Sequence, residues 1–237
     1  MKFPSRFYLP VFLSVFWITL LAHASSRHES AVGILSTSGN TEVSSVAVRH
    51  ESALDWDIDT LGVRAGLTRA SNQGVETASL WDFGTTYGRK IGPRYSLTLG
   101  ELIEGNRFQN LLQRYSTDAG LRYEFEKEGW SAGASLGYRF SRENYPVGSS
   151  DFHLARIRVN GAHAFTPGVS LSGLVELLPN FTRSEAWQAN SEVALVTQLN
   201  SVFSLKSEFR WRIYNQPPAG VRFRGDTALT TALVARF

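Results

Sequence analysis

The sequence predicts an all-β protein, a transmembrane antiparallel up-and-down β-barrel of about twelve strands. Three observations predict this fold: an N-terminal secretory leader, an alternation of polar and apolar residues along most of the chain, and a final strand that ends on Phe237. Alternation with a period of two is typical of a β-strand that has one polar and one apolar face. A closing strand that ends on an aromatic residue is typical of bacterial outer-membrane barrels.

The leader predicts export through the inner membrane. Lys2 and Arg6 form a basic start, residues 9–21 form a nearly continuous apolar run, and an A-x-A cleavage pattern ends at Ala24. The apolar run is shorter than the roughly 20 residues that a spanning helix needs. We therefore expect a signal peptide that is removed during export.

The remaining chain is expected to hold two parts, a short N-terminal periplasmic segment at residues 25–30 and the barrel at residues 31–237, after a signal peptide at residues 1–24. Loss of the leader lowers the formal charge from +3 to about +1, so nucleic acid is not an implied partner. The chain has no cysteine, which excludes disulfides, thiolate zinc sites and a lipid anchor on cysteine. No cofactor is implied.

Twelve stretches of the chain predict strands, most of them longer than the 9–11 residues that a tilted membrane strand requires. Beyond the leader, no stretch approaches 18 apolar residues, so no transmembrane helix is expected. The expected strands are residues 31–37, 42–53, 58–70, 75–89, 95–106, 113–126, 130–142, 152–165, 169–178, 187–199, 202–214 and 225–237.

The alternation also predicts which face of each strand meets lipid. In residues 113–126, for example, Leu121 and Phe125 share one face, whereas Arg114 and Asp118 share the other. A Lys or Arg on the lipid face at the bilayer centre costs roughly 2–4 kcal/mol, so the charged faces are expected to point inward. Aromatic residues near strand ends are expected to form interfacial girdles. These are Trp81, Tyr87, Tyr95, Tyr115, Trp130, Tyr138, Trp187 and Trp211.

Connection lengths predict the orientation in the membrane. Tight connections, such as residues 127–129 and 166–168, alternate with longer ones at residues 144–151, 179–186 and 215–224. Bacterial barrels place short turns in the periplasm and long loops outside the cell. An even number of strands then places both termini in the periplasm.

The lumen is the candidate functional site. Unpaired arginines would make an anion-attracting pore, whereas cross-strand ion pairs would fill the interior. The basic candidates are Arg49, Arg64, Arg114, Arg122, Arg139, Arg156, Arg158, Lys206, Arg210 and Arg212, and the acidic candidates are Glu76, Asp82, Glu104, Asp118, Glu124, Glu176, Glu192 and Glu208. Because the two signs nearly balance, we favour a narrow lumen lined by ion pairs.

Two arginine doublets, Arg156 with Arg158 and Arg210 with Arg212, are the candidate anion-binding wall. The competing interpretation is that they form structural salt bridges with nearby carboxylates. The candidate ion-pair partners in the lumen are Glu176, Glu192, Asp118, Arg122, Arg139 and Glu208.

No catalytic or metal-binding motif is expected to act. Residues 133–137 match the G-x-S-x-G pattern, but that motif needs a sharp strand-to-helix turn and here it lies within an expected strand. Ser150 and His153 lie near one strand end, where a Ser–His pair for a lipid acyl hydrolase could sit. Nothing else in the sequence marks these two residues as catalytic, so we expect no enzyme. The alternatives are a barrel enzyme that acts on envelope lipids and a soluble periplasmic β-protein.

Three segments resemble the domain-of-unknown-function family 481, whose members are also labelled salt-induced outer membrane proteins. They are residues 36–42, with the turn sequence SGNTE, residues 214–220, with NQPPAG, and residues 226–234 of the final strand. The resemblance implies an outer-membrane barrel and a link to osmotic or salt stress, and it implies no reaction or ligand. The expected function is structural or a narrow, poorly selective passage. The expected partners are outer-membrane lipids and the barrel assembly machinery, with Phe237 as the C-terminal assembly signal.

Overall fold

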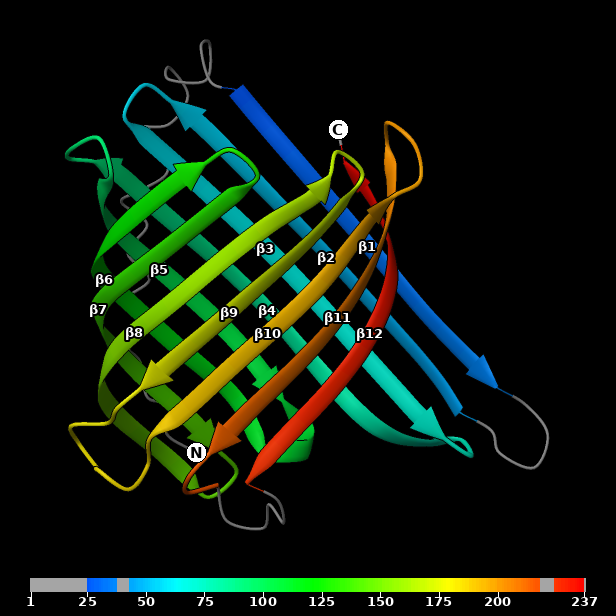
Figure 1. Cartoon of the computed structure of the whole chain (residues 1–237). Helices are drawn as coiled ribbons and strands as arrows, with labels where there is room; N and C mark the ends of the chain where they lie inside the picture. The colour runs from blue at the N-terminus through cyan, green and yellow to red at the C-terminus, as the bar shows by residue number, and fades with distance from the viewer. Residues whose placement is uncertain (1–24, 38–42, 218–223, 237) are drawn as a thin grey trace, which may run out of the picture.

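The structure is a computed structural model that describes residues 25–37, 43–217 and 224–236. Within these residues, twelve antiparallel strands follow one another around a closed barrel in which β1 meets β12 (Figure 1). The strands are β1 Ser25–Thr37, β2 Val43–Trp56, β3 Asp59–Asn72, β4 Val75–Lys90, β5 Tyr95–Asn106, β6 Leu111–Lys127, β7 Trp130–Tyr145, β8 Gly148–Thr166, β9 Val169–Leu178, β10 Gln188–Gln198, β11 Phe203–Tyr214 and β12 Gly225–Arg236. The expected all-β up-and-down fold is confirmed.

Helix is almost absent from the described part of the chain. A single 3-10 turn, η3 (Arg107–Gln109), connects β5 to β6. No described helix has the length and apolar character to cross a membrane. The signal peptide and Phe237 lie outside the described residues, and so does the turn at residues 38–42.

β1 begins earlier than the sequence predicts. Residues 25–30, expected as a separate segment, form the first half of this strand and pair with β2. Arg27 Nη2 lies 2.8 Å from Asp55 Oδ2, and Arg236 Nε lies 2.8 Å from Glu29 Oε2. Arg27 and Glu29 interrupt the apolar pattern here but keep its period of two residues. Both point to the lumen side, where their partners lie on β2 and β12.

The connection between β7 and β8 is also shorter than expected. Instead of a loop over residues 144–151, the two strands stay paired as far as Tyr145 and Gly148 and leave only Pro146 and Val147 between them. The Arg142 guanidinium donates two hydrogen bonds to the Asp151 carboxylate, at 2.7 and 2.6 Å. Polar pairs can extend a hairpin beyond the apolar belt because that part of the strand needs no apolar face.

The two ends of the barrel differ. At one end, called here the turn end, lie the connections at residues 57–58, 91–94, 128–129, 167–168 and 199–202, with the first residue of β1 and the last of β12. At the other, called the loop end, lie residues 73–74, 107–110, 146–147, 179–187 and 215–217. The turn at residues 73–74 is tight because Gln73 and Gly74 both adopt positive φ, at 49° and 74°. The longer connection at residues 179–187 and the described residues 215–217 of the next long one thus share the loop end, as the sequence predicts.

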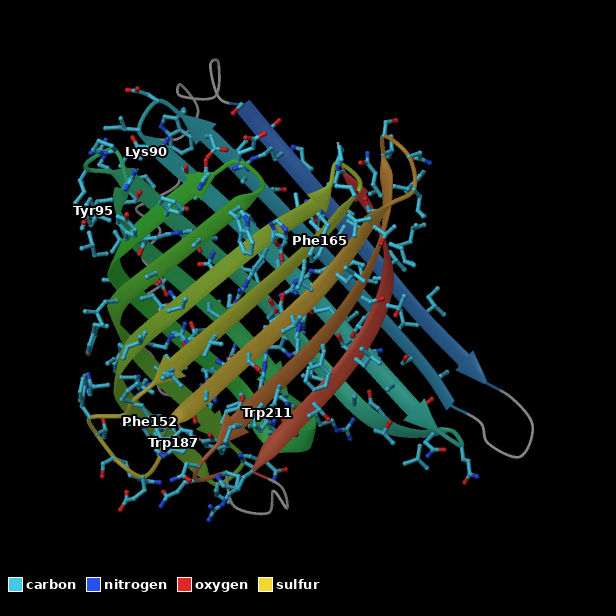
Figure 2. The ribbon with its side chains drawn as sticks, in the orientation of Figure 1. Lys90, Tyr95, Phe152, Phe165, Trp187 and Trp211 are labelled. Atoms are coloured by element: carbon cyan, nitrogen blue, oxygen red, sulfur yellow. The ribbon has the colours of Figure 1, made fainter. Side chains whose placement is uncertain are left out.

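The exterior of the barrel is a belt of exposed apolar side chains. Leu99 is 56% exposed and Leu136 is 64% exposed, and both lie near the middle of their strands. Tyr95 and Phe165 lie toward the turn end, whereas Trp187 and Trp211 lie toward the loop end (Figure 2). This is the distribution of a surface that meets hydrocarbon between two aromatic girdles.

Ring contacts strengthen the girdle at the turn end. The Trp130 and His163 rings stack with centroids 3.9 Å apart, and the Phe165 ring meets His163 edge-on at 4.7 Å. His163 also forms a 2.9 Å hydrogen bond with the Gly129 carbonyl. The polar edge of the His163 ring therefore has a partner while its ring packs against Trp130 and Phe165.

We predict that Leu136→Arg destabilises the barrel by about 2–4 kcal/mol, because it places a guanidinium on the apolar belt near the middle of the strand. Val147→Arg, at the fully exposed β7–β8 turn, is the matched control and is expected to change stability by less than about 0.5 kcal/mol. Urea-induced unfolding in lipid vesicles measures both. Equal losses in the two variants would contradict a lipid-facing belt.

Candidate functional site

The lumen is formed by the side chains that alternate with the apolar belt. Register places inward charges of β6 and β7 together: the expected Asp118 and Arg139 lie opposite each other, and the expected Arg114 lies opposite Glu143, which was not among the candidates. The same alternation in β11 directs Lys206, Glu208, Arg210 and Arg212 inward. Glu76 was also expected in the lumen. It lies at the loop end instead, where it pairs with Arg107 at 3.0 Å.

Arg114 is the centre of the ion-pair cluster nearest the loop end. Its guanidinium is buried and lies 2.7 Å from both Glu104 Oε1 and Glu143 Oε1. The Tyr214 ring stands 5.9 Å from its charged carbon, in cation–π range. Arg212 Nη1 lies 4.0 Å from Glu104 Oε2, which brings β11 into the same cluster.

Glu143 was missed from the sequence because the expected strand ended at residue 142. The signal was present: Arg139, Ser141 and Glu143 continue the polar face of β7 with a period of two. The role of Tyr214 could not be read from the sequence. Its contact with Arg114 spans the lumen between strands that are not neighbours.

A second cluster lies on β6 to β10. Arg139 donates two hydrogen bonds to Asp118, at 2.6 and 2.8 Å. Arg156 donates a 2.7 Å hydrogen bond to Glu176, whose other oxygen accepts one from Asn190 at 2.9 Å. Arg156 also lies 3.6 Å from Asp118, so one guanidinium joins the two carboxylates.

A third cluster surrounds Glu208, which is buried on β11. Its carboxylate forms ion pairs with Lys206, at 2.6 Å, and with Arg210, and it lies 4.0 Å from Arg49. Arg210 also lies 3.5 Å from Glu192. Three cations therefore share one buried carboxylate in this part of the wall.

The candidate anion wall is thus mostly engaged with carboxylates. Arg156 and Arg210 each lie between two carboxylates, and Arg212 reaches Glu104 at the limit of ion-pair range. Arg122 pairs with Glu124 at 2.7 Å. Among the described residues, Arg158 has no ion pair within 4.0 Å, and it lines the lumen beside Arg156.

Three of the cavities lined by described residues lie in a row along the barrel. At the loop end is a vestibule of about 600 Å³, in the middle a space of about 320 Å³, and at the turn end a space of about 830 Å³. The vestibule and the middle space share Arg114, Gln188 and Tyr214, and the middle and turn-end spaces share Arg156 and Arg158. The three cavities therefore follow one another, and the clusters around Arg114 and Arg156 lie at the two junctions.

Apolar side chains narrow the loop end further. Phe152, Leu154 and Leu178 pack together on the inner side of β8 and β9, and Leu154 is only 2% exposed. The connection at residues 179–187 lies along β8, where the Phe181 amide donates to the His153 carbonyl at 2.7 Å. This inner apolar cluster gives the vestibule a fixed wall.

The geometry does not bring Ser150 and His153 together as a pair, and the Ser–His hydrogen bonds of the described residues lie instead on β1 and β2, where His28 and His50 contact Ser30 and Ser52 at 2.8 Å. Ser150 lines the vestibule, whereas His153 lies on the outer face, where it contacts the Tyr138 hydroxyl and the Phe140 ring. The two residues are an odd number of positions apart on one strand and therefore face opposite sides. Ser135 lies within β7, so its motif has no strand-to-helix turn. The described residues contain no cluster of three or more potential metal ligands.

The fold and lumen define the class: a twelve-stranded up-and-down barrel with an apolar exterior and an interior lined by ion pairs. Residues 30–237 match the family described as "Protein of unknown function, DUF481", and the chain belongs to that family. The resemblance inferred from the turn and final-strand segments is confirmed.

Two solved structures share the fold at low sequence identity. The COG4313 outer membrane channel from Pseudomonas putida F1 is 12% identical, with a TM-score of 0.53 over 92% of this chain and 97% of that chain. The NanC porin is 11% identical, with a TM-score of 0.51 over 90% of this chain and 98% of that chain. A search of the curated proteins gave no match.

We predict that Arg114→Ala destabilises the barrel by about 3–5 kcal/mol, because it leaves the Glu104 and Glu143 carboxylates buried without their cation. Arg122→Ala, which removes the half-exposed pair with Glu124, is the matched control and is expected to cost about 0–1 kcal/mol. The free energy of unfolding in detergent micelles measures both variants. A cost for Arg114→Ala no larger than that of the control would show that the cluster is solvated and not structural.

Proposed function

We propose that the protein is a bacterial outer-membrane barrel that forms a narrow, weakly selective passage for small polar solutes. The row of three cavities with shared lining residues carries this proposal. Twelve strands enclose more space than the eight-stranded barrels whose interiors side chains fill, and here the lining is charged and suited to water. The solved channel and porin of similar fold support the same class.

The proposed placement in the membrane follows from the exterior. The apolar belt crosses the bilayer, the turn end faces the periplasm and the loop end faces outward, as in other barrels with short periplasmic turns. Export by the leader, insertion by the barrel assembly machinery through a final strand ending on Phe237, and contact with outer-membrane lipids belong to this proposal.

The ion pairs determine the proposed transport properties. Because each cluster holds both signs of charge close together, most of the lumen field cancels over a few ångströms. Among the described cations that line the middle space, Arg158 is the exception, since its charge has no carboxylate within ion-pair range. The proposed passage is therefore narrow and slightly anion-selective.

A catalytic role is not part of the proposal, because Ser150 and His153, the serine and histidine considered for an acyl hydrolase, lie on opposite faces of β8. The link to osmotic or salt stress that the family resemblance implies stays a prediction. Growth at high salt of a strain that lacks the protein would test it.

We predict discrete single-channel openings in planar bilayers, with a modest preference for chloride over potassium. Arg158→Gln is expected to remove most of this preference, because it deletes the one cation of the middle space that has no ion-pair partner among the described residues. Arg142→Gln, which removes a cation from the outer face, is the matched control and is expected to keep the preference. A folded barrel that never conducts would overturn the proposed passage, and an unchanged preference in Arg158→Gln would overturn the role of Arg158.

A further inference from the structure

The seam between β1 and β12 is much shorter than every other strand pairing in the barrel. It joins four residue pairs, from Glu29↔Arg236 to Val32↔Leu233, whereas the other neighbouring strands are joined by at least nine. Residues 33–37 and 225–232 pair with β2 and β11 but not with each other. Figure 1 shows β1 and β12 meeting near the turn end and diverging toward the loop end. Among the described residues, β1 and β12 therefore stay unpaired toward the loop end, which leaves an opening between them there.

From residue 228 to residue 232, the β12 edge of this opening carries small, uncharged inward side chains, whereas Asp226, nearer the loop end, accepts a hydrogen bond from Gln109. Ala228, Thr230 and Ala232 of β12 alternate with outward residues and face the lumen, as do Ala31 and Gly33 of β1. This stretch differs from the neighbouring lumen wall on β11, where Lys206, Glu208, Arg210 and Arg212 take the corresponding inward positions. The outward residues beside the opening are apolar and strongly exposed: Leu229 is 77% and Ile34 is 72% exposed.

Behind the opening lies a small cavity of about 100 Å³ with a surplus of positive charge. Both seam strands line it, through Ala31, Thr230 and Ala232. Its charged lining residues are Arg49, Arg114, Lys206, Arg210 and Arg212 against Asp82, Glu104 and Glu208. The Nε of Arg210 is buried and donates no well-directed hydrogen bond within the described residues. This volume exceeds three times the share of one liquid water molecule, roughly 30 Å³, and suits a carboxylate-sized group.

An open strand edge in hydrocarbon is costly, because lipid tails cannot satisfy backbone N–H and C=O groups. Acyl chains of the membrane can reach this edge, and the cavity behind it favours an anion. A single molecule can fill both places if it has an anionic headgroup in the cavity and an alkyl tail that leaves through the seam.

We propose that the β1–β12 seam is a lateral binding site for a long-chain carboxylate taken from the membrane. The carboxylate lies in the cavity near Arg49, Lys206 and Arg210, and the alkyl chain leaves between the unpaired parts of β1 and β12, on the loop-end side of the contact between Gly33 and Ala232. The site rests on the proposed membrane placement but not on conduction through the lumen.

Fluorescence of cis-parinaric acid with the refolded barrel in maltoside micelles tests the site. Ala232→Phe puts a ring into the cavity and is expected to weaken binding at least tenfold. Thr231→Phe is the matched control, since its side chain lies on the lipid face of the same strand, and it is expected to bind like the wild type. Lys206→Met is expected to weaken binding of the acid but not of its methyl ester. Equal binding by all variants, or equal loss in Ala232→Phe and Thr231→Phe, would overturn the site.

Two outcomes separate this site from its alternatives. Disulfide-linked dimers of Ile34→Cys in membranes, with no probe binding, would show that a second copy covers the open edge and would overturn the amphiphile site. A barrel that folds without detergent would overturn the proposed membrane placement itself. Loss of probe binding with unchanged single-channel conductance in Ala232→Phe would support the seam as a site separate from the passage.

Discussion

The constraint on which this structure depends is that each strand separates two environments, an apolar one outside and a polar one enclosed within. Closure of the sheet satisfies the backbone hydrogen bonds of nearly all strand residues between neighbours, so that the exterior can consist of side chains such as Leu99 and Leu136. The same alternation forces the arginines and carboxylates inward. The apolar belt and the charged lumen are therefore two consequences of one pattern.

Most of the charged side chains in the lumen are paired with one another, so few of them are left to bind a ligand. Burial of an unpaired guanidinium or carboxylate is costly. In this lumen the buried charges share partners; Arg156, for example, lies between Asp118 and Glu176. This arrangement narrows the interior and cancels most of its field. What distinguishes the lumen functionally is then the small number of places where pairing is incomplete, at Arg158 and along the β1–β12 seam.

Much of the fold could be predicted from the sequence, because a strand face is encoded by residues two apart. The inward direction of Arg114, Asp118 and Arg139 followed from that local rule. The start of β1 and the β7–β8 hairpin were missed because polar and charged residues extend these strands beyond the apolar belt.

The site was less predictable, because contacts across the lumen depend on the curvature and stagger of the barrel. No local pattern shows that Tyr214 reaches Arg114, or that Arg212 approaches Glu104. The short seam is a property of how the first and last strands meet, and each of them alternates normally when read alone. The separation of Ser150 from His153, in contrast, follows from their odd spacing and could have been recognised at once.

A nitroxide scan along β7 tests the two-environment constraint most directly, since a chain without cysteine allows single labels at each of the positions 133–139. In lipid bilayers, collisional accessibility to oxygen should peak at labels on Ala134, Leu136 and Tyr138. Accessibility to a water-soluble nickel chelate should be higher at labels on Gly133, Ser135, Gly137 and Arg139. Accessibilities that do not alternate, or outward labels that prefer the nickel chelate, would contradict a barrel whose apolar face meets lipid.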